Sequence, residues 1–441
     1  MTNKLQDAAR QIFLSALQAV DPRTAVRSAV MLDDSQLKVR DTEINIRERP
    51  IYVLAIGKAA ASMVAGIKDV LGDRITKGII CGPLLEDIHL SNWQMFRGGH
   101  PLPNAASIAA ARAALDMLKA AQPDALIIFL ISGGSSAMFE LPVNDEITLE
   151  DLGDANRHLV ASGATINEIN AVRRAFSAVK GGKLSALADT DQITLIVSDT
   201  NVGDTASVAS GPTIQPDRNA PVAAEVIKKF GLEDALPKSI MKAIAHPVVE
   251  PSLSTKRLRA HHVLLDNHTA LEAAATAAER LGFAVEIATD INEQDIDAGC
   301  DLMLSRAESL WRRSNGRATC LVSGGEFSCP VRGDGAGGRN LETVLRCAMK
   351  LDEVKPRLTA SQWAVLSAGT DGIDGNSQAA GAVADETTMG RVGSANLDAL
   401  SLLERSDAFL FFAALGDVII TEATGTNVRD VRLVLAEGRG S

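Results

Sequence analysis

The chain of 441 residues is longer than a single hydrophobic core normally fills, so its length favours two domains. Its formal net charge of −11 argues against a general nucleic-acid-binding protein, which would carry a basic face. Aromatic residues make up only 3% of the chain, so the core must be aliphatic and tightly layered, as in helices packed on a parallel sheet. The five scattered cysteines include no C-x-x-C pair, which favours reduced thiols, and no apolar run approaches the roughly 20 residues of a membrane span. We therefore expect a cytoplasmic protein that binds neither nucleic acid nor membrane.

The first residues of the chain predict an amphipathic helix. Apolar residues recur at helical spacing until Asp21 and Pro22 end the pattern, and charged and amide residues interrupt it. This composition is typical of a helix that docks on the rest of the protein, not of a signal peptide. The apolar stripe consists of Leu5, Ala9, Ile12, Ala16 and Val20.

Strand and helix patterns alternate through the first half of the chain. Thr148 and Asp151 form a capping box, and Gly181 is the predicted stop of the helix that begins near Ile166. The predicted elements are, in chain order, a strand at 51–56, an alanine-rich helix after it, a helix from Asn104, a strand at 125–131, helices from Thr148 and Ile166, and a strand at 193–198.

A second series of strands and helices is predicted after a proline-richer stretch at 210–260, which has the composition of a hinge region. Such alternation predicts doubly wound α/β layers, in which ligands bind outside the carboxyl ends of the strands. We expect an N-terminal α/β domain at 1–245 and a C-terminal α/β domain at 246–441. The predicted strands of the second series are 262–266, 284–288, 318–323, 363–368 and 417–421.

Two polar stretches follow strands of the first half. Lys58 stands at a strand-to-helix junction, where an ammonium group beside backbone N–H donors suits phosphate, although a solvent-facing lysine is equally plausible. The segment "SGGSS" follows the strand at 125–131 and offers consecutive backbone N–H groups as an anion nest, with a tight turn for packing as the alternative. It does not match the G-x-S-x-G pattern of a serine nucleophile.

Carboxylates mark further candidate positions. Asp199 ends the strand at 193–198, where it could accept a proton from a substrate hydroxyl or hold Mg²⁺. Asp204 after it could equally be a helix cap or part of an Asx turn. Asp371 and Asp374 lie among glycines, where metal binding and turn formation are both open.

A glycine-rich stretch at 333–338, "GDGAGG", formally matches G-x-G-x-x-G. The preceding strand ends ten residues earlier, so as a dinucleotide fingerprint the match is weak. Glu326 and Arg339 flank this stretch. The cations, carboxylates and glycine loops together favour an enzyme that acts on phosphate with a divalent ion.

As a set, the polar motifs resemble those of the class II glycerate kinases, whose C-terminal half is called the MOFRL domain and which are often labelled tartrate-pathway hydroxypyruvate reductases. The resemblance covers nearly the whole chain and places the MOFRL region at about 315–435. It implies an N-terminal Rossmann-like three-layer α/β/α domain, a C-terminal α/β domain and an active site in the cleft between them. It implies transfer of phosphate from ATP to D-glycerate, giving 2-phosphoglycerate, with Mg²⁺ or another divalent cation. The motifs are, in order, "AIGKAA", "GGHPLPN", "LISGGSSA", "NAVRRAFSAVKGGKL", "VSDTNVGDTASVASGPT", "SGGE…GGRN", "SAGTDGIDG" and "TGTNVRD".

The resemblance assigns catalytic roles to Lys58, Asp199 and Arg339. From the carboxylate positions described above, we expect Asp199 and Asp371 to be the Mg²⁺ ligands. The chain departs from the family at "GGEFS", where "GGETT" is expected, and at "DGNSQAAG", where "DGPTDAAG" is expected. Gln378 therefore replaces an acid and weakens a metal role for that loop. The predicted substrate- and nucleotide-binding residues are Gly57, Ser132, Gly133, Gly134, Ser135, Ser136, Lys180, Gly324, Gly325, Glu326, Gly338, Asn340 and Asp371.

Two other functions are compatible with the sequence. One is an NAD(P)H-dependent hydroxypyruvate reductase, which the family's second label and "GDGAGG" support. The other is a non-catalytic sensor of sugar acids, which the presence of Lys58, Asp199 and Arg339 disfavours. The partners expected are small molecules, glycerate and ATP, and the oligomeric state is open, a homo-oligomer included.

Overall fold

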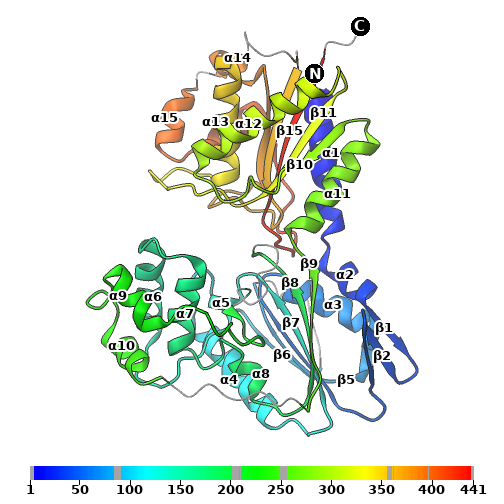
Figure 1. Ribbon diagram of the computed structural model, residues 1–441, viewed down its shortest axis with the longest axis vertical. Helices are drawn as coiled ribbons and strands as arrows, with labels where there is room; N and C mark the ends of the chain where they lie inside the picture. The colour runs from blue at the N-terminus through cyan, green and yellow to red at the C-terminus, as the bar shows by residue number, and fades with distance from the viewer. Residues whose placement is uncertain are drawn as a thin grey trace. The chain divides into compact units, whose positions relative to one another are not determined.

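The computed structural model of the chain describes residues 4–83, 91–200, 208, 210–247, 256–354, 360, 362–395 and 397–438. The chain forms two compact units, which are coloured along the sequence in Figure 1. The N-terminal unit is Pro22–Leu265, and the C-terminal unit combines Asp266–Ser441 with Met1–Asp21. Asp204 and Ser207 of the "SDTNVGDTAS" motif lie outside the described residues.

The N-terminal unit is built on a parallel six-stranded sheet with the order β6-β5-β4-β7-β8-β9. Counted within the sheet, this is the 3-2-1-4-5-6 order of the Rossmann fold, so the Rossmann-like prediction is confirmed. Ile56 is level with Ile131, and Ser132 with Val197, so β4, β7 and β8 end at one edge. The strands are β4 Ile51–Ile56, β5 Ile75–Cys81, β6 Trp93–Phe96, β7 Leu126–Ser132, β8 Asp191–Val197 and β9 Arg259–Leu265.

Helices cover this sheet because its strands are apolar on both faces. Leu54, Ile56 and Phe129 belong to one buried cluster with helix α4 (Ala105–Lys119). Helix α3 (Ala60–Leu71) packs against β4, β5 and β7 and buries Met63, Ile67 and Leu71, as its spacing predicted. The predicted start of α4 is also confirmed, since Asn104 caps it.

A separate group of four helices lies beside the sheet in the same unit (Figure 1). The predicted capping box of Thr148 and Asp151 starts α6. Helix α7 ends at Phe176 instead of Gly181, because the chain turns to pair with residues 141–143 through the bonds Val143 N–H to Phe176 O and Ala178 N–H to Leu141 O. Helices α9 and α10 of this group lie in the stretch at 210–260 that was predicted to be a hinge region. The helices are α6 Leu149–Ala161, α7 Ile166–Phe176, α9 Ala223–Phe230 and α10 Lys238–Ala245.

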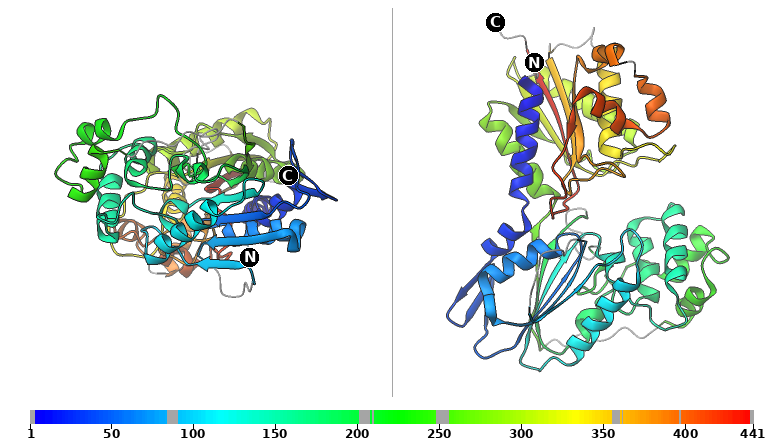
Figure 2. Two further views of the ribbon diagram at one scale, coloured as in Figure 1. Left: turned by 90° about the horizontal axis from the view of Figure 1, so that it is seen from below. Right: turned by 180° about the vertical axis from the view of Figure 1, so that it is seen from behind.

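The unit boundary differs from the expected division at residue 245. Strand β9 pairs with β8, so the strand predicted to open the second domain is the sixth strand of the first sheet. Asp266 follows it and caps helix α11 (Asn267–Arg280). The predicted stripe of the first helix, α1 (Lys4–Ala19), is buried, but it packs against α11 and the C-terminal sheet, so this helix belongs to the C-terminal unit (Figures 1 and 2).

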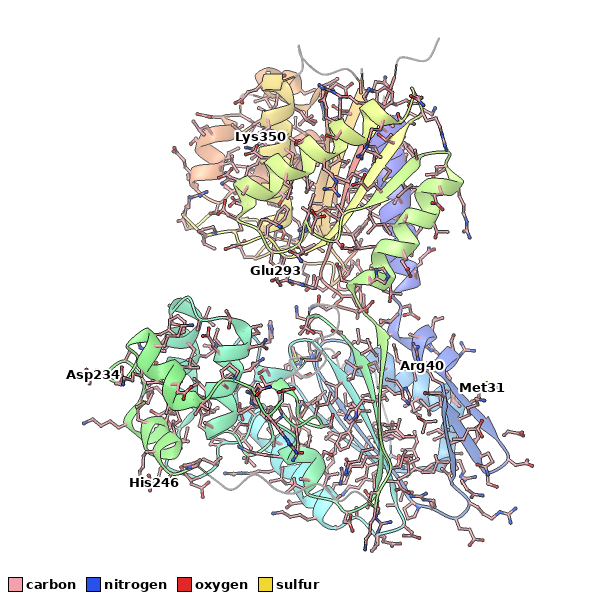
Figure 3. The ribbon with its side chains drawn as sticks, viewed as in Figure 1. Met31, Arg40, Asp234, His246, Glu293 and Lys350 are labelled. Carbon is pink, nitrogen blue, oxygen red and sulfur yellow. The ribbon has the colours of Figure 1, made fainter. Side chains whose placement is uncertain are left out.

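A small antiparallel sheet precedes β4 and was not predicted, because its strands are only four residues long. It consists of β1 Val30–Asp33, β2 Gln36–Val39 and β3 Thr42–Asn45. Met31 and Arg40, both labelled in Figure 3, lie in this sheet and in the turn that joins β2 to β3. Helix α2 (Pro22–Ala29) leads into it and packs on α3.

The C-terminal unit has a six-stranded sheet of mixed direction, with the order β10-β11-β15-β12-β13-β14. Only β10 and β11 are parallel, so the doubly wound arrangement predicted for this half is wrong. Strand β15 lies in the middle and was missed, together with β13. The strands are β10 Ala284–Ile287, β11 Thr319–Gly325, β12 Gln362–Gly369, β13 Gly381–Asp385, β14 Val418–Ile419 and β15 Asp430–Glu437.

Helices of the C-terminal unit form two buried clusters with this sheet. Within the described residues, no helix is both long and apolar enough to cross a bilayer. Besides α1 and α11, the helices are α12 Ile296–Arg313, α13 Arg339–Val354, α14 Thr388–Ala395, α15 Ala399–Glu404 and α16 Ala408–Leu415.

Candidate active site

The loops after β4 and β7 meet where the strand order of the N-terminal sheet reverses. This is the edge at which Rossmann-type sheets bind ligands. Gly57 has φ of 108°, and a Cβ there would lie 2.5 Å from the Ser132 carbonyl oxygen, so only glycine fits. Lys58 N–H donates to Gly133 O at 2.9 Å, and Ala59 N–H donates to Ser132 Oγ at 3.0 Å. The fold therefore brings together two of the predicted polar stretches.

The loop after β7 offers a row of backbone donors. Among the residues that the structure describes, no acceptor contacts the N–H groups of Gly133, Gly134, Ser135 or Ser136. Gly134 is left-handed, with φ of 78°, and it starts the short helix α5 (Ser135–Met138). Successive N–H groups around a left-handed residue form an anion-binding concavity. This arrangement favours the anion nest over a turn that serves packing alone.

The side chains of Ser132 and Ser135 serve the structure of this loop. Ser132 Oγ donates to Ile56 O at 3.2 Å, and Ser135 Oγ donates to Ser132 O. Ser136 Oγ lies 2.8 Å from Ser210 Oγ. Because the N–H groups of Gly57, Lys58 and Ala59 are also bonded within the fold, Lys58 can contribute its ammonium group but not the backbone donors that we expected beside it.

Asp199 lies beside this nest. It follows β8, the neighbour of β7, and a Cβ on Gly133 would come 2.0 Å from Asp199 Oδ2. Asp199 and Lys58 are both half-buried. The ends of three adjacent strands thus supply a cation, a backbone anion nest and a carboxylate.

Lys180 is buried behind the nest. Its ammonium donates to Ser136 O at 2.9 Å and to the carboxylate of Glu140, and its exposed fraction is 1%. Burial lowers the pKa of Lys180, and the charge of Glu140 opposes this shift. The geometry favours a positioning role for Lys180 over the direct ligand contact that we predicted.

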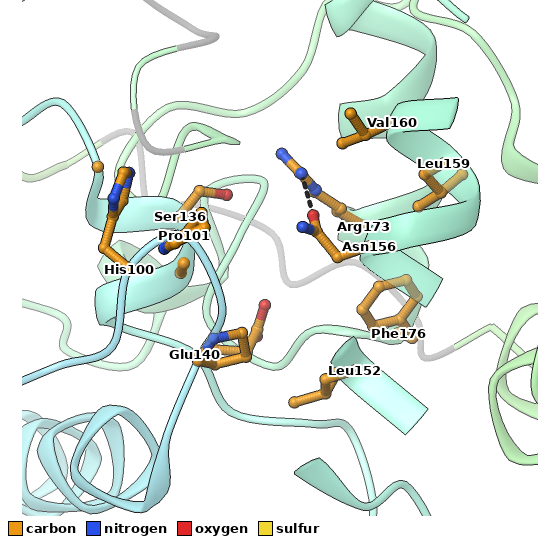
Figure 4. Close-up of a pocket in the computed structure, with 13 residues that line it drawn as sticks. His100, Pro101, Ser136, Glu140, Leu152, Asn156, Leu159, Val160, Arg173 and Phe176 are labelled. Atoms are coloured by element: carbon orange, nitrogen blue, oxygen red, sulfur yellow. Dashed lines mark hydrogen bonds between the residues drawn. The ribbon is translucent and has the colours of Figure 1, made fainter. Parts of the chain in front are cut away.

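A pocket of about 230 Å³ is lined by the predicted binding residues Gly134 and Ser136, and the sequence did not predict the rest of its lining (Figure 4). Arg173 from α7 donates to Asn156 Oδ1 from α6. Burial lowers the pKa of Arg173, while the Glu140 carboxylate raises it. For Arg173, the only signal in the sequence was its place in the motif "NAVRRAFSAVKGGKL", which does not show which of its basic residues faces a pocket.

In the C-terminal unit, Arg339 begins α13 and is held by two carboxylates. Its Nε donates to Asp430 Oδ2 at 2.6 Å and its Nη2 to Asp430 Oδ1 at 3.2 Å, while Glu326 Oε1 lies 2.9 Å from Nη2. Burial lowers the pKa of Arg339, but the charges of Asp430 and Glu326 raise it above its ordinary value on balance. Two predicted residues, Glu326 and Arg339, thus form one ion-pair network with Asp430, which the sequence reasoning missed.

Asp374 caps the same helix. Asn340 N–H donates to Asp374 Oδ1 at 3.1 Å and Leu341 N–H donates to Oδ2 at 2.8 Å. Burial raises the pKa of Asp374 to about 7, against the effect of these N–H groups. A Cβ on Gly338 would lie 2.5 Å from Asp374 Oδ1, so glycine is required before the helix. Metal binding and turn formation were both open for Asp374, and these contacts favour the structural role.

The "SGGE" loop after β11 is fixed by Asn267. Gly325 N–H donates to Asn267 Oδ1 at 3.0 Å, and a Cβ on Gly324 would lie 1.9 Å from that atom. These glycines therefore allow a close approach of Asn267, which is a structural requirement. The stretch "GDGAGG" packs along Arg405 and Asp407 and does not follow a strand directly, so it lacks the setting of a dinucleotide fingerprint.

The described residues contain no cluster of three or more histidine, cysteine or acidic side chains that could hold a metal ion. Mg²⁺ in kinases usually needs only one or two carboxylates together with the phosphates of the nucleotide. Asp199 beside the anion nest fits this requirement. Asp371 Oδ1 accepts the Ile373 N–H at 3.3 Å, as in an Asx turn.

Comparisons with known proteins match both units. Residues 8–245 match the family described as a domain of unknown function, DUF4147, and residues 319–430 match the MOFRL family. A glycerate 2-kinase from Pyrococcus horikoshii is 32% identical over 431 residues, which is 96% of each chain. A glycerate kinase from Rattus norvegicus is 30% identical, covering 98% of this chain and 93% of its own.

A protein from Agrobacterium vitis, provisionally named hydroxypyruvate reductase, is 34% identical over 87% of this chain and 98% of its own. Among solved structures, a glycerate kinase from Thermotoga maritima superposes with a TM-score of 0.80 at 27% identity, covering 98% of this chain and 99% of its own. A protein from Pyrococcus horikoshii superposes with a TM-score of 0.77 at 30% identity over the whole of both chains.

Proposed function

This chain belongs to the family that combines DUF4147 and MOFRL domains, and from this premise we propose that it is an ATP-dependent glycerate kinase that forms 2-phosphoglycerate with Mg²⁺. The observation that supports this most strongly is the meeting of Lys58, the nest at 133–136 and Asp199 at the switch point of the N-terminal sheet. The names of its relatives indicate the substrate, and the geometry of these residues supports phosphoryl transfer.

Phosphoryl transfer requires positioning and charge stabilisation more than covalent chemistry. The N–H groups of the nest would hold phosphoryl oxygens, and the Lys58 ammonium would balance the charge that moves from one oxygen to another. Asp199 would accept the proton of the attacking hydroxyl or hold Mg²⁺. When bound, Mg²⁺ would neutralise phosphate charge, and Asp199 is the carboxylate of this edge that would hold it. We also propose a catalytic role for the cation Arg339 of the C-terminal unit.

A coupled assay tests this function. We expect D-glycerate-dependent release of ADP, and phosphorus NMR of the product should show 2-phosphoglycerate. Lys58→Ala should raise the KM for ATP, and Lys58→Arg should rescue little, because a planar guanidinium does not replace a compact ammonium. Lys68→Ala, farther along α3, is the matched control and should leave the kinetics unchanged.

Other results would point elsewhere. Oxidation of NAD(P)H that depends on hydroxypyruvate, without ADP release, would establish a reductase instead. Glycerate binding without either reaction would establish a sensor. Unchanged kinetics in Lys58→Ala would remove Lys58 from the site.

A further inference from the structure

The pocket beside Gly134 lies within the N-terminal unit and adjoins the proposed phosphoryl-transfer residues. A Cβ on Gly134 would lie 3.2 Å from Lys58 Cγ and 3.3 Å from His100 Cδ2, and both Gly134 and His100 line the pocket. Asp199 packs on the preceding residue, Gly133. A ligand in this pocket would therefore lie next to the residues proposed to move the phosphoryl group.

Arg173 is a cation that lines this pocket, and its hydrogen-bond partner is a neutral side chain. Its guanidinium donates to the amide of Asn156, and it forms no ion pair with a carboxylate among the described residues. In Figure 4 it extends from α7 toward the side of the pocket where Ser136 and His100 lie. A guanidinium has several N–H donors, so donors remain for a planar, bidentate acceptor such as a carboxylate.

Among the described residues, the one carboxylate that lines the pocket, Glu140, is already neutralised. Lys180 donates to Glu140 Oε2, while Ser177 Oγ and Leu141 N–H donate to Oε1 at 2.5 and 2.9 Å. Glu140 also attracts Arg173, but Lys180 pairs with the same carboxylate, so these three described groups leave one positive charge unbalanced. The rest of the wall is largely apolar, so an anion that enters would lose water and would depend on Arg173 for compensation. The apolar wall includes Leu152, Leu159, Val160 and Phe176.

Ser136 supplies the opposite polarity on the other side of the pocket. Ser210 Oγ donates to Asn170 Oδ1 at 2.8 Å, so the hydrogen bond between Ser136 and Ser210 is donated by Ser136. Its oxygen then retains lone pairs that can accept a hydrogen bond from a ligand hydroxyl. One end of the pocket thus suits a carboxylate and the other suits a hydroxyl.

We propose that this pocket is the acceptor subsite of the kinase, in which Arg173 binds the carboxylate of a small hydroxy acid and Ser136 accepts a hydrogen bond from a hydroxyl. The inference rests on the proposed function and adds the residues that select the acceptor. Pockets for drug-sized ligands occupy roughly 300–1,000 Å³, so about 230 Å³ suits a small acid better than a nucleotide. A neutral polyol of the same length lacks the group that Arg173 would bind.

Arg173→Lys and Arg173→Met test the subsite, with kinetics and equilibrium binding of D-glycerate measured on the same preparations. We expect the glycerate KM and Kd to rise at least about tenfold, since charge-assisted bonds are worth roughly 1.5–3 kcal/mol. The KM for ATP should stay within about twofold. The preference of the wild type for glycerate over glycerol should shrink in Arg173→Met. Arg157→Ala is the matched control, because Arg157 lies on α6, is exposed and pairs with Asp154.

Normal melting temperatures would show that the variants fold. If Arg173→Met does not fold, Arg173→Lys, which keeps the positive charge, still tests the subsite. Wild-type turnover with an unchanged glycerate KM in both variants would overturn the subsite and leave the proposed function standing. A raised KM for ATP with an unchanged KM for glycerate would assign the pocket to phosphate and overturn the carboxylate assignment. A wild type that neither binds nor phosphorylates glycerate would overturn both proposals.

Discussion

The carboxylate of Asp199 occupies the space that a side chain at position 133 would need. A Cβ built on Gly133 lies 2.0 Å from Asp199 Oδ2, 2.5 Å from its Cγ and 2.9 Å from its Cβ. The "SGG" of the loop is therefore required for this carboxylate to lie against the anion nest. The relationship connects two motifs that are more than sixty residues apart in the sequence.

Gly133→Ala should lower kcat by about a hundredfold or more, because the added methyl group must displace Asp199 and small displacements of catalytic groups are costly. The measurement is kcat together with the melting temperature. Gly390→Ala is the control, since a Cβ there meets nothing within 4 Å. Wild-type turnover in a folded Gly133→Ala variant would show that the position of Asp199 does not matter for the reaction.

Asp199→Asn should keep the shape of the site and lower kcat by about 10²–10⁴, the range typical for loss of a general base. A purely structural role would reduce stability and leave turnover per folded molecule nearly normal. Asp191→Asn, at the other end of β8, should show that structural behaviour, because Asp191 pairs with Arg49 at 2.8 Å. If Asp199→Asn melts and turns over like the wild type, neither the base nor the metal assignment survives.

Arg339→Lys should lower turnover although it keeps the charge. A lysine cannot form the bidentate contact with the buried Asp430 and also bond to Glu326, because it lacks the planar guanidinium. Stability should also fall, so kcat must be expressed per folded molecule. Arg346 lies on the same helix as Arg339 and forms ion pairs with Asp297 of α12 and Glu342 of α13, so Arg346→Lys should reduce stability alone. Equal kinetics in the two variants would limit Arg339 to a structural role.

The stability of the protein should fall between about pH 4 and 7 through Asp374. Its pKa is raised to about 7 in the folded state, so the folded protein retains a proton that the unfolded chain releases near its ordinary pKa. The contribution is complete below the unfolded pKa and is lost as the pH rises through the folded pKa. The difference in unfolding free energy between wild type and Asp374→Asn should change by an amount on the order of 2 kcal/mol from pH 5 to 8.

Denaturant unfolding of both proteins at a series of pH values measures this difference. The other titrating groups are common to both proteins and cancel. Parallel pH profiles would show that Asp374 is ionised throughout, as the two N–H donors of α13 would favour.

Local sequence patterns determined the elements whose signals are short in range. Helical spacing predicted the buried face of α1, capping residues predicted the starts of α4 and α6, and apolar runs ending in small residues predicted the strand ends that carry Lys58 and Asp199. These patterns suffice because the periodicity of apolar residues and the first-turn hydrogen bonds of a helix involve residues only a few positions apart.

The tertiary structure alone decided what each apolar face and each charge would contact. The stripe of α1 does not encode its packing on a unit that begins at Asp266, and β9 does not encode its place in the first sheet. Lys180 is paired with Glu140, 40 positions away, and Arg339 with Asp430, 91 positions away. Such contacts depend on which segments the complete fold places side by side, because burial and charge pairing act through space and leave no periodic signal along the chain.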